Sequence, residues 1–502
     1  MKHYKIGARG SLLSVTQTKL MQKELEALTG DKFEIITIKT QGDLNTSVPL
    51  WQMQGKDFFT KELDEALLKN EIDLVVHSYK DLGSVRPEGI KLAAVTKRSF
   101  AHDILLIKDE TIAKLKEKDH LVIGTSSPRR IINIEKNLAS YLPYCEGKKV
   151  STKMLRGNVN TRIKKLCDGE YDAIVLAMAG LERLTSNEEA LKELSSLLED
   201  LNFMILPQST FPSSASQGAL AIECLENRKD NGELYQKLSK LTDQDTLEEV
   251  KRERVAFNRY GGGCHLAVGI HVRKVGPYYL HFHQGEVDHK PIKEKFLEPK
   301  PIALPQGDYF SGMNDSIIEM VSLAPDLSSH NHYLVSSRHC LSALSTIPKK
   351  SMLWSSGVKT HQKMAAAGHW VHGSADSFGM MELNPFISSK LVQLLMKNHG
   401  INAQIKVLTN DLSEHDDAPS IATYTRKIKA PNAETKVRIL ATKLFYWTSF
   451  FQYQTYLSLF PELSQNDRVH TCGLGKTWKE FEAKGLKVIP LPGPDYLKTL
   501  SK

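Results

Sequence analysis

Residues 74–81, Leu-Val-Val-His-Ser-Tyr-Lys-Asp, combine a short apolar run with a polar cluster that follows it directly. The run predicts a buried strand over 74–77. Helix-like spacing of apolar residues, as in Phe59, Leu63, Ala66 and Leu67, lies between several such runs. This alternation predicts α/β domains with largely parallel sheets. The other predicted strands of the first 220 residues are 4–8, 34–39, 92–95, 104–107, 121–124 and 173–176.

Length and composition narrow the function classes. The chain has 502 residues and a formal net charge of +8, which permits an anionic ligand without demanding nucleic acid. It has no Lys/Arg-rich run with interleaved aromatics, so we expect no nucleic-acid partner. Its six cysteines are scattered without metal-ligand spacing, which favours reduced thiols and no metal. With no apolar run of ~20 residues and no apolar leader, we expect no membrane partner and a cytoplasmic location.

Polar clusters follow several predicted strands, where ligands of open α/β sheets bind. We expect them to meet at one edge of each sheet. They are Arg9-Gly10-Ser11, residues 77–81, residues 124–130 (Gly-Thr-Ser-Ser-Pro-Arg-Arg), residues 156–162 (Arg-Gly-Asn-Val-Asn-Thr-Arg) and residues 179–183 (Ala-Gly-Leu-Glu-Arg).

Two of these arginines stand where a helix disfavours them. Ser127-Pro128 predicts a helix N-cap with proline at the first helical position. Arg129 and Arg130 then occupy a first turn, where the helix dipole disfavours cations by several tenths of a kcal/mol each. An anion bound at that turn would offset this cost. The alternative is a basic patch that points into water.

Lys80-Asp81 places one carboxylate among these cations. Asp81 fits electrostatic stabilisation of a cationic intermediate with proton transfer, and the alternative is a structural salt bridge. Phe59 can cover an aromatic ligand or anchor a core at the start of a helix.

The alternating pattern of strands and helices is interrupted by a Pro/Ser/Gly-rich segment over 206–218, and a different pattern follows it. A helix over 246–260 and strands over 267–272 and 278–283 predict a smaller α+β unit. Gly261-Gly262-Gly263 would end the helix in a turn with left-handed backbone and present the Cys264 thiol on a bare loop. A half-buried, inert cysteine is the alternative. Three prolines and a glycine over 297–307 predict a linker.

These segments together resemble porphobilinogen deaminase over residues 5 to about 285. The resemblance rests on IGARGS, HSYKD, GTSSPRR, LRGNVNTR, AGLERL, SQGALAIEC and GGGCHLAVGI, in the family's order. It implies two α/β domains like type-II periplasmic binding proteins and a small α+β domain with the cysteine. The implied domains are 1–96 with 200–220, 97–199, and 221–298.

The family's chemistry implies roles for individual residues. Porphobilinogen, a pyrrole with two carboxylate arms, loses ammonia, and four units are joined on a dipyrromethane cofactor. The resemblance assigns covalent attachment of dipyrromethane to Cys264 and catalysis to Asp81 and Lys80. We expect the enzyme to be a monomer. It assigns further cofactor contacts to Lys80, Asp81, Ser127, Arg129 and Arg130, and substrate contacts to Arg9, Ser11, Phe59, Arg156, Arg162 and Arg183.

Residues 310–502 resemble uroporphyrinogen-III synthase, which implies a two-lobed α/β domain that cyclises the deaminase product. Strand-turn signals recur at 333–337 and 445–449, and glycine-containing turns at 355–360 and 472–477 precede predicted helices. Serines and threonines at these strand ends either cap helices or contact a ligand. Tyr424 is the candidate general acid, or an ordinary strand tyrosine. The competing interpretations are an inactive C-terminal domain and a non-catalytic anion sensor.

Overall fold

The computed structural model describes residues 1–40, 60–263, 265–301, 304–305, 308–314, 316–413, 418–465 and 467–498. The chain divides into two compact units. The first comprises Met1–Arg273, Phe282–Glu294 and Ser388–Asn398. The second comprises Lys274–His281, Lys295–Ile387 and His399–Lys502.

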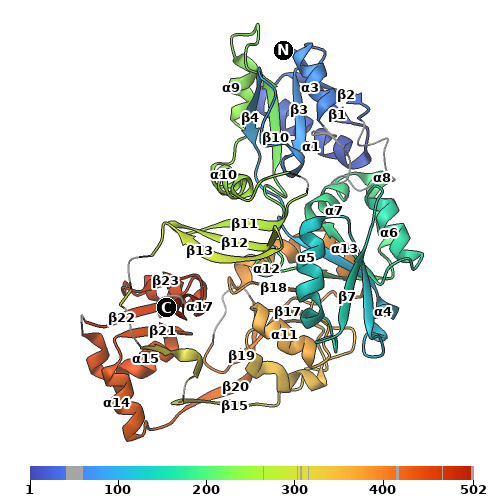
Figure 1. The fold of residues 1–502 in the computed structure, drawn as a ribbon. Coiled ribbons are helices and arrows are strands. Elements are labelled where there is room, and N and C mark those ends of the chain that lie inside the picture. Colours follow the sequence, from blue (N-terminus) through green and yellow to red (C-terminus); the bar gives the residue numbers. More distant parts are fainter. Residues whose placement is uncertain are drawn as a thin grey trace. The chain divides into compact units, whose positions relative to one another are not determined.

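The first sheet of unit 1 has the strand order β2-β1-β3-β10-β4 (Figure 1). β1 runs parallel to β2 and β3, whereas β10 runs antiparallel to β3 and β4. Its core contains Ile6, Leu74 and Ile222, all fully buried. The elements are β1 (His3–Arg9), α1 (Leu12–Thr29), β2 (Lys32–Ile38), α3 (Lys61–Leu68), β3 (Leu74–Ser78), η2 (Tyr79–Asp81), β4 (Ile90–Val95), β10 (Leu220–Leu225) and α9 (Glu233–Ser239).

The second sheet repeats this plan, with the order β7-β6-β8-β5-β9. β6 runs parallel to β7 and β8, and β5 runs antiparallel to β8 and β9. Each sheet thus places one antiparallel strand fourth in its order. The elements are β5 (Asp103–Lys108), α4 (Asp109–Ala113), β6 (His120–Gly124), α5 (Pro128–Asn137), η3 (Leu138–Tyr141), β7 (Lys149–Lys153), α6 (Val159–Cys167), β8 (Ala173–Ala177), α7 (Met178–Leu184), α8 (Glu188–Leu197) and β9 (Leu201–Ile205).

These pairings correct two predicted boundaries. Residues 200–220 were assigned to the first sheet, but β9 pairs with β5 in the second. Residues from 221 onward were assigned to the α+β unit, but β10 completes the first sheet. The reason is that the chain passes between the two sheets twice. It leaves the first sheet between β4 and β5, and it returns only after β9, between β9 and β10. The mixed α/β class and the seven predicted strands are confirmed.

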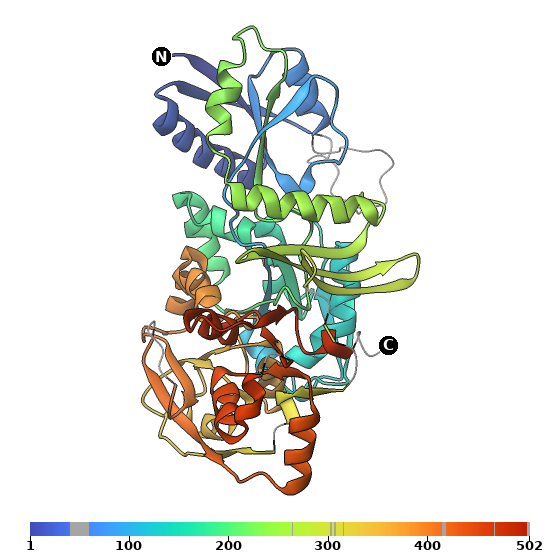
Figure 2. The ribbon, with the colours of Figure 1, turned by 90° about the vertical axis from the view of Figure 1, so that its left-hand side faces the viewer.

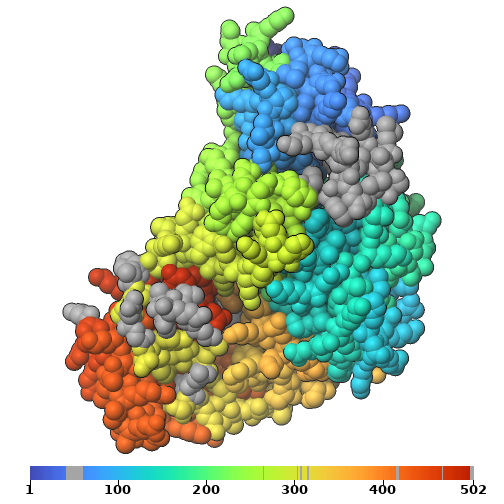
Figure 3. All heavy atoms as spheres, viewed as in Figure 1, coloured from blue at the N-terminus to red at the C-terminus, as the bar shows by residue number. Residues whose placement is uncertain are grey.

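The predicted helix before the glycine turn is α10 (Gln244–Arg259), in yellow-green in Figure 2. It is followed by a sheet ordered β11-β12-β13, made of β11 (Ala267–Val275), β12 (Tyr278–Val287) and β13 (Lys290–Glu298). Ala256 of α10 packs in one cluster with Val268 and Ile270 of β11. Both α10 and this sheet reach the surface shown in Figure 3. The helix and first two strands were predicted, whereas β13 occupies residues expected to precede a linker.

Unit 2 contains two further sheets. One has the order β15-β20-β19-β16-β17-β18 and the other is the parallel sheet β14-β21-β22-β23. The strands are β14 (Tyr309–Ser311), β15 (Ile318–Ser322), β16 (His332–Val335), β17 (Met352–Ser355), β18 (Gly373–Ser374), β19 (Lys406–Asn410), β20 (Ser420–Ile428), β21 (Leu444–Trp447), β22 (Val469–Gly473) and β23 (Ile489–Leu491). The helices are η4 (Gly312–Asn314), η5 (Arg338–Thr346), α11 (Val358–Ala366), α12 (Met380–Ser388), α14 (Ala433–Ala441), α15 (Phe450–Leu459), η6 (Pro461–Ser464), α16 (Lys476–Ala483) and α17 (Asp495–Lys498).

The predicted strand-turn-helix units are present here. β17 leads into α11, and β22 leads into α16. Ser337 and Ser449 cap η5 and α15, because their hydroxyl oxygens accept backbone N–H groups of His339 and Gln452. Of the two roles considered for serines at these strand ends, helix capping and ligand contact, these two serines have the capping role. None of the helices in the described part of the chain is long and apolar enough to cross a membrane.

Candidate active site

Lys80 and Asp81 lie in η2, immediately after the buried strand β3. The Lys80 ammonium donates a hydrogen bond of 3.2 Å to Oε1 of Gln217. Burial lowers the pKa of Lys80 to about 8, although Asp81 acts in the opposite direction. Asp81 itself is exposed. The turn therefore presents a solvent-accessible carboxylate beside a partly desolvated cation.

Arg254 of α10 holds this turn from outside. Its guanidinium donates to the carbonyl oxygens of Leu82 at 3.1 Å and Gly83 at 2.7 Å. The same group lies over the ring of Tyr79, 4.8 Å from its centroid. Two turns later α10 ends at the glycine turn, so one helix supports both Asp81 and the segment that leads to Cys264.

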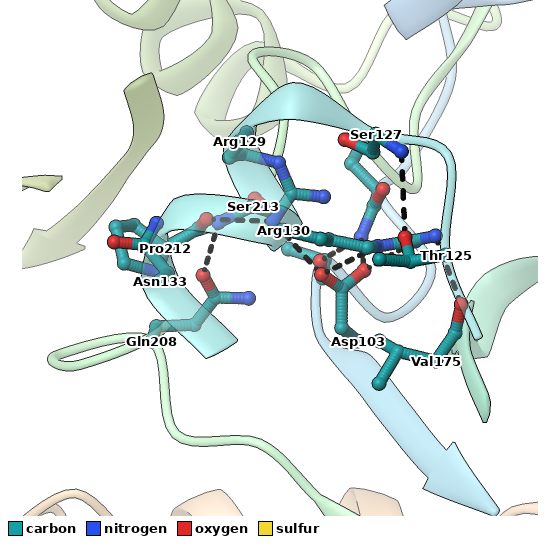
Figure 4. A network of polar contacts seen from close by, with 12 residues as sticks. Asp103, Thr125, Ser127, Arg129, Arg130, Asn133, Val175, Gln208, Pro212 and Ser213 are labelled. Atoms are coloured by element: carbon teal, nitrogen blue, oxygen red, sulfur yellow. Dashed lines mark hydrogen bonds and ion pairs between the residues drawn. The ribbon is translucent and has the colours of Figure 1, made fainter. Parts of the chain in front are cut away.

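Arg129 and Arg130 begin α5 as predicted, with Ser127 at the N-cap and Pro128 first. The Ser127 side chain makes no capping hydrogen bond. Both arginines are buried and share one carboxylate, Asp103 at the start of β5 (Figure 4). Arg129 Nη1 lies 2.8 Å from Asp103 Oδ2, and Arg130 Nη2 lies 2.7 Å from Oδ1.

Asp103 corrects the electrostatic interpretation of α5. The sequence left the two arginines either with a bound anion or in water, but the protein supplies an anion of its own. Burial opposes ionisation of Asp103, and the two guanidiniums outweigh burial and lower the pKa of its carboxyl group. One donor of Arg129 is unused, because its buried Nε has no hydrogen-bond partner among the described residues. That donor can still bind a ligand carboxylate.

Gln217 joins this cluster to Lys80. Its Nε2 donates to Asp103 Oδ1 at 2.8 Å, while its Oε1 accepts from Lys80. Lys80 comes from the first sheet and Asp103 from the second, so the contacts unite side chains from both. Sequence reasoning missed Asp103, Gln217 and Arg254. An aspartate directly before the predicted strand 104–107 was the one available signal for Asp103.

Arg162 and Arg183 add positive charge without acidic partners. Arg162 Nε donates to the Gly157 carbonyl at 2.8 Å, and Arg183 Nη2 donates to the Gly218 carbonyl at 2.6 Å. Neither forms an ion pair with any residue that the structure describes. Burial lowers the pKa of Arg183 to about 10. Burial, Arg130 and Arg156 together lower the pKa of Arg162 to about 10, although Asp81 acts in the opposite direction. The pKa of Arg156 is also lowered by burial.

The other predicted contacts have mixed outcomes. Ser11 caps α1, since its hydroxyl oxygen accepts the Ser14 N–H at 3.3 Å, and half-buried Arg9 ends β1. Phe59 and Cys264 lie outside the described residues. The glycine turn before Cys264 is confirmed, because Gly261, Gly262 and Gly263 have φ of 98°, 60° and 90°.

In unit 2, Tyr424 lies in β20 and is buried in a hydrophobic cluster. Burial raises the pKa of its hydroxyl group, against hydrogen bonds from Asn410 and Ser337 that lower it. Its ring centroid lies 5.6 Å from that of His339. The position suits a proton donor that stays neutral at physiological pH, and it suits a core tyrosine equally.

Asp64, His77 and Glu223 form a buried cluster whose ligand atoms lie within 4.8 Å of one another. Such a set can hold a metal ion. Here Arg86 donates to carboxylates of both Asp64 and Glu223, at 2.8 Å for Glu223. The guanidinium supplies the positive charge that a metal would otherwise bring.

Comparisons with known proteins relate this chain to one enzyme family. Residues 4–233 match the family model described as porphobilinogen deaminase, dipyromethane cofactor binding domain. A probable porphobilinogen deaminase of Methanocella arvoryzae is 38% identical over 273 residues, which are 54% of this chain and 80% of that protein. The porphobilinogen deaminase of Streptococcus sanguinis is 37% identical over 282 residues, 56% of this chain and 85% of that protein.

Among solved structures, a periplasmic sulfonate-binding protein, SsuA of Methylobacillus flagellatus, overlaps 52% of this chain and 72% of its own. The sequence identity is 13% and the TM-score is 0.27. We therefore describe the fold by the strand orders given above and not by this overlap. The identity to the sequence relatives extends over most of their length. The chain belongs to the porphobilinogen deaminase family.

Proposed function

We propose that residues 1–298 are an active porphobilinogen deaminase that joins four porphobilinogen units into the linear tetrapyrrole hydroxymethylbilane. The observation that carries the proposal is the buried set of cations around an exposed aspartate. Arg129, Arg162 and Arg183 retain donors or charge that the described protein groups leave unmatched. A substrate with two carboxylate arms supplies the missing anions.

The residues fit a dipyrromethane cofactor. Its acetate and propionate groups match the Arg129 and Arg130 cluster, where the buried Arg129 Nε is without a partner in the described structure. The glycine turn, whose three residues have positive φ, directly precedes Cys264, the proposed point of attachment. Lys80, Asp81 and Ser127 complete the proposed contacts. When bound, this group supplies the pyrrole carbon to which the first substrate unit is joined.

The chain's own residues then act on each incoming porphobilinogen. Arg9, Ser11, Arg156, Arg162 and Arg183 are the proposed partners of its carboxylate arms. The aminomethyl C–N bond breaks and ammonia leaves, and the pyrrole ring takes up positive charge. Asp81 faces this charge and stabilises it once bound substrate displaces water from its exposed carboxylate, because an oriented carboxylate acts more strongly where water is excluded. A C–C bond to the acceptor pyrrole forms, and the proton of that carbon is lost.

Intact mass spectrometry tests cofactor attachment. The purified chain should carry the added mass of a dipyrromethane, and Cys264→Ala should lose it. Cys167→Ala is the matched control, because Cys167 is an exposed thiol outside the proposed site. An unmodified wild-type chain that also fails to consume porphobilinogen would favour a non-catalytic anion sensor.

Turnover measurements test the aspartate. Asp81→Ala should lower kcat for porphobilinogen about a hundredfold to a thousandfold, as expected for loss of a charge that faces the transition state. Its circular dichroism should match the wild type, since Asp81 is exposed. Near-normal kcat would remove Asp81 from the mechanism.

We further propose that residues 310–502 cyclise the product as a uroporphyrinogen-III synthase. Two sheets with repeated strand-turn-helix units support this proposal. Tyr424 is its candidate acid. Product analysis decides: the type III isomer from porphobilinogen alone supports an active synthase, and type I alone supports an inactive domain. The proposal includes a monomeric, cytoplasmic enzyme, and sedimentation of the purified chain tests the monomer.

A further inference from the structure

One helix from the C-terminal two-fifths of the sequence belongs to compact unit 1. This helix is α13 (Lys390–Asn398), which follows β13 by about ninety residues in the sequence. It contacts α7 and β9 of the second sheet (Figure 1). A segment far away in the sequence thus completes the layer that contains α7.

The N-terminus of α13 is bound by the carboxylate of Glu182 on α7. The backbone N–H of Lys390 lies 3.1 Å from Oε1, and the N–H of Leu391 lies 3.0 Å from Oε2. The first N–H groups of a helix have no partner within the helix, and their dipole favours an anion. Both oxygens of Glu182 are therefore used to hold the start of α13.

The other end of α13 is held by the end of α8. The Asn398 side chain donates to the carbonyl oxygen of Leu198 at 3.2 Å, and Leu198 is the C-cap residue of α8. Polar contacts at both ends fix the direction of α13 as well as its position.

Between these ends α13 has one apolar stripe. Leu391, Val392 and Leu395 are fully buried, whereas Gln393 and Lys397 are exposed. This spacing is typical of a helix that packs one face on a neighbour. Here the neighbours are α7 and β9. The docking therefore joins an apolar face to specific polar contacts at its ends.

Glu182 is followed by Arg183, whose guanidinium donates to the Gly218 carbonyl in the segment between β9 and β10. One short helix thus carries the contact to α13 and a proposed substrate-binding arginine. We propose that the surface of α7, α8 and β9 is a docking site for α13, and that this docking holds α7 where Arg183 can bind a substrate carboxylate. The effect of docking on Arg183 rests on the proposed deaminase function, whereas the docking itself does not.

Hydrogen exchange of the full-length chain tests the docking. Glu182→Gln keeps the shape but turns one oxygen into an N–H₂ donor that faces a helix N–H. Peptides covering 390–398 should exchange at least about tenfold faster than in the wild type, the size expected for loss of a helix cap. Glu189→Gln, an exposed change on the next helix, should leave these rates unchanged. Leu395→Asp should accelerate exchange independently of the cap. Wild-type exchange in both Glu182→Gln and Leu395→Asp would overturn the docking.

Kinetics test the link to Arg183. In Glu182→Gln the KM for porphobilinogen should rise several-fold while kcat stays within about twofold, because Asp81 is not displaced. An unchanged KM together with faster exchange would refute the link and leave the docking standing. A wild-type chain without turnover would instead refute the proposed function, and the exchange experiment would still decide the docking.

Discussion

Replacing Glu253 by glutamine should strongly destabilise the junction around α10. Glu253 is fully buried and accepts hydrogen bonds from Arg98 Nη2 and the Ser216 backbone N–H, each at 2.6 Å. It also accepts from the Val272 N–H at 2.9 Å. These partners come from the two crossing segments and from β11, so one carboxylate joins four parts of unit 1. Glutamine keeps the shape, removes the charge and points an N–H₂ group at one of these donors.

Two estimates of the loss agree. Burial disfavours the Glu253 carboxylate, but Arg98 and the other donors outweigh burial and lower its pKa from 4.5 to about 2. At about 1.4 kcal/mol per pH unit, this corresponds to about 3 kcal/mol of stability. Removing one partner of a buried ion pair costs about 3–5 kcal/mol. We therefore expect Glu253→Gln to lower the local unfolding free energy by at least about 3 kcal/mol.

Hydrogen exchange measured on α10 is the suitable assay, because it reports on the helix that carries Glu253. A loss of about 3 kcal/mol should speed exchange of the slowest α10 amides on the order of a hundredfold. Glu248→Gln on the same helix is the control. Its partly exposed pairs with Lys251 and Arg252 should be worth less than about 1 kcal/mol.

The pH dependence gives an independent check. A lowered folded pKa means that the contribution of Glu253 is complete above about pH 4.5 and disappears as the pH falls from there to about 2. The difference between wild type and Glu253→Gln should shrink over that interval. Equal exchange rates of the two proteins at pH 7 would refute the assignment of Glu253 as the centre of this junction.

Three further substitutions probe the site. Arg254→Met removes the guanidinium that holds the Lys80-Asp81 turn, so kcat for porphobilinogen should fall about tenfold to a hundredfold while intact mass shows the cofactor retained; unchanged kcat would mean that the turn is rigid without it. Lys80 loses its charge as the pH rises through about 8, so activity should fall there, and Lys80→Arg should move this decline to higher pH; a decline at the same pH would implicate another group. Tyr424→Phe should shift the product from type III to type I with porphobilinogen consumption unchanged, and an unchanged isomer ratio would make Tyr424 a core residue.

The sequence predicted the positions of strands in unit 1 better than it predicted which strands pair with one another. Apolar runs locate seven strands correctly. β3, β5 and β8 give the clearest signal, because they are buried along nearly their whole length and read as continuous apolar runs. β9 and β10 were not among the predicted strands, and the domain bounds implied by the resemblance placed their residues in the wrong domains. β13 was missed because Lys290–Glu298 has only three large apolar residues, Ile292, Phe296 and Leu297, among five charged ones. Prolines nearby made this polar segment resemble a linker.

The candidate site was predicted in part for a related reason. Lys80, Arg129 and Arg130 stand out because cations follow strand ends, a local pattern. Asp103 lies 26 residues before Arg129 and Gln217 lies 114 residues after Asp103, and only the pairing of β5 and the return of β10 bring them together. Contacts of this kind depend on topology, which apolar periodicity does not encode.

Asp103 neutralises part of the positive charge at α5, yet the arrangement still favours an anionic ligand. One carboxylate is shared by two buried guanidiniums, and through Gln217 it also lies near the Lys80 ammonium. A single negative charge cannot balance three cations, and burying the excess costs free energy. Asp103 orients Arg129 and Arg130 and leaves a net positive charge beside exposed Asp81. That residual charge is what a carboxylate-rich pyrrole can neutralise, so the internal aspartate organises the anion site and leaves it open to a ligand.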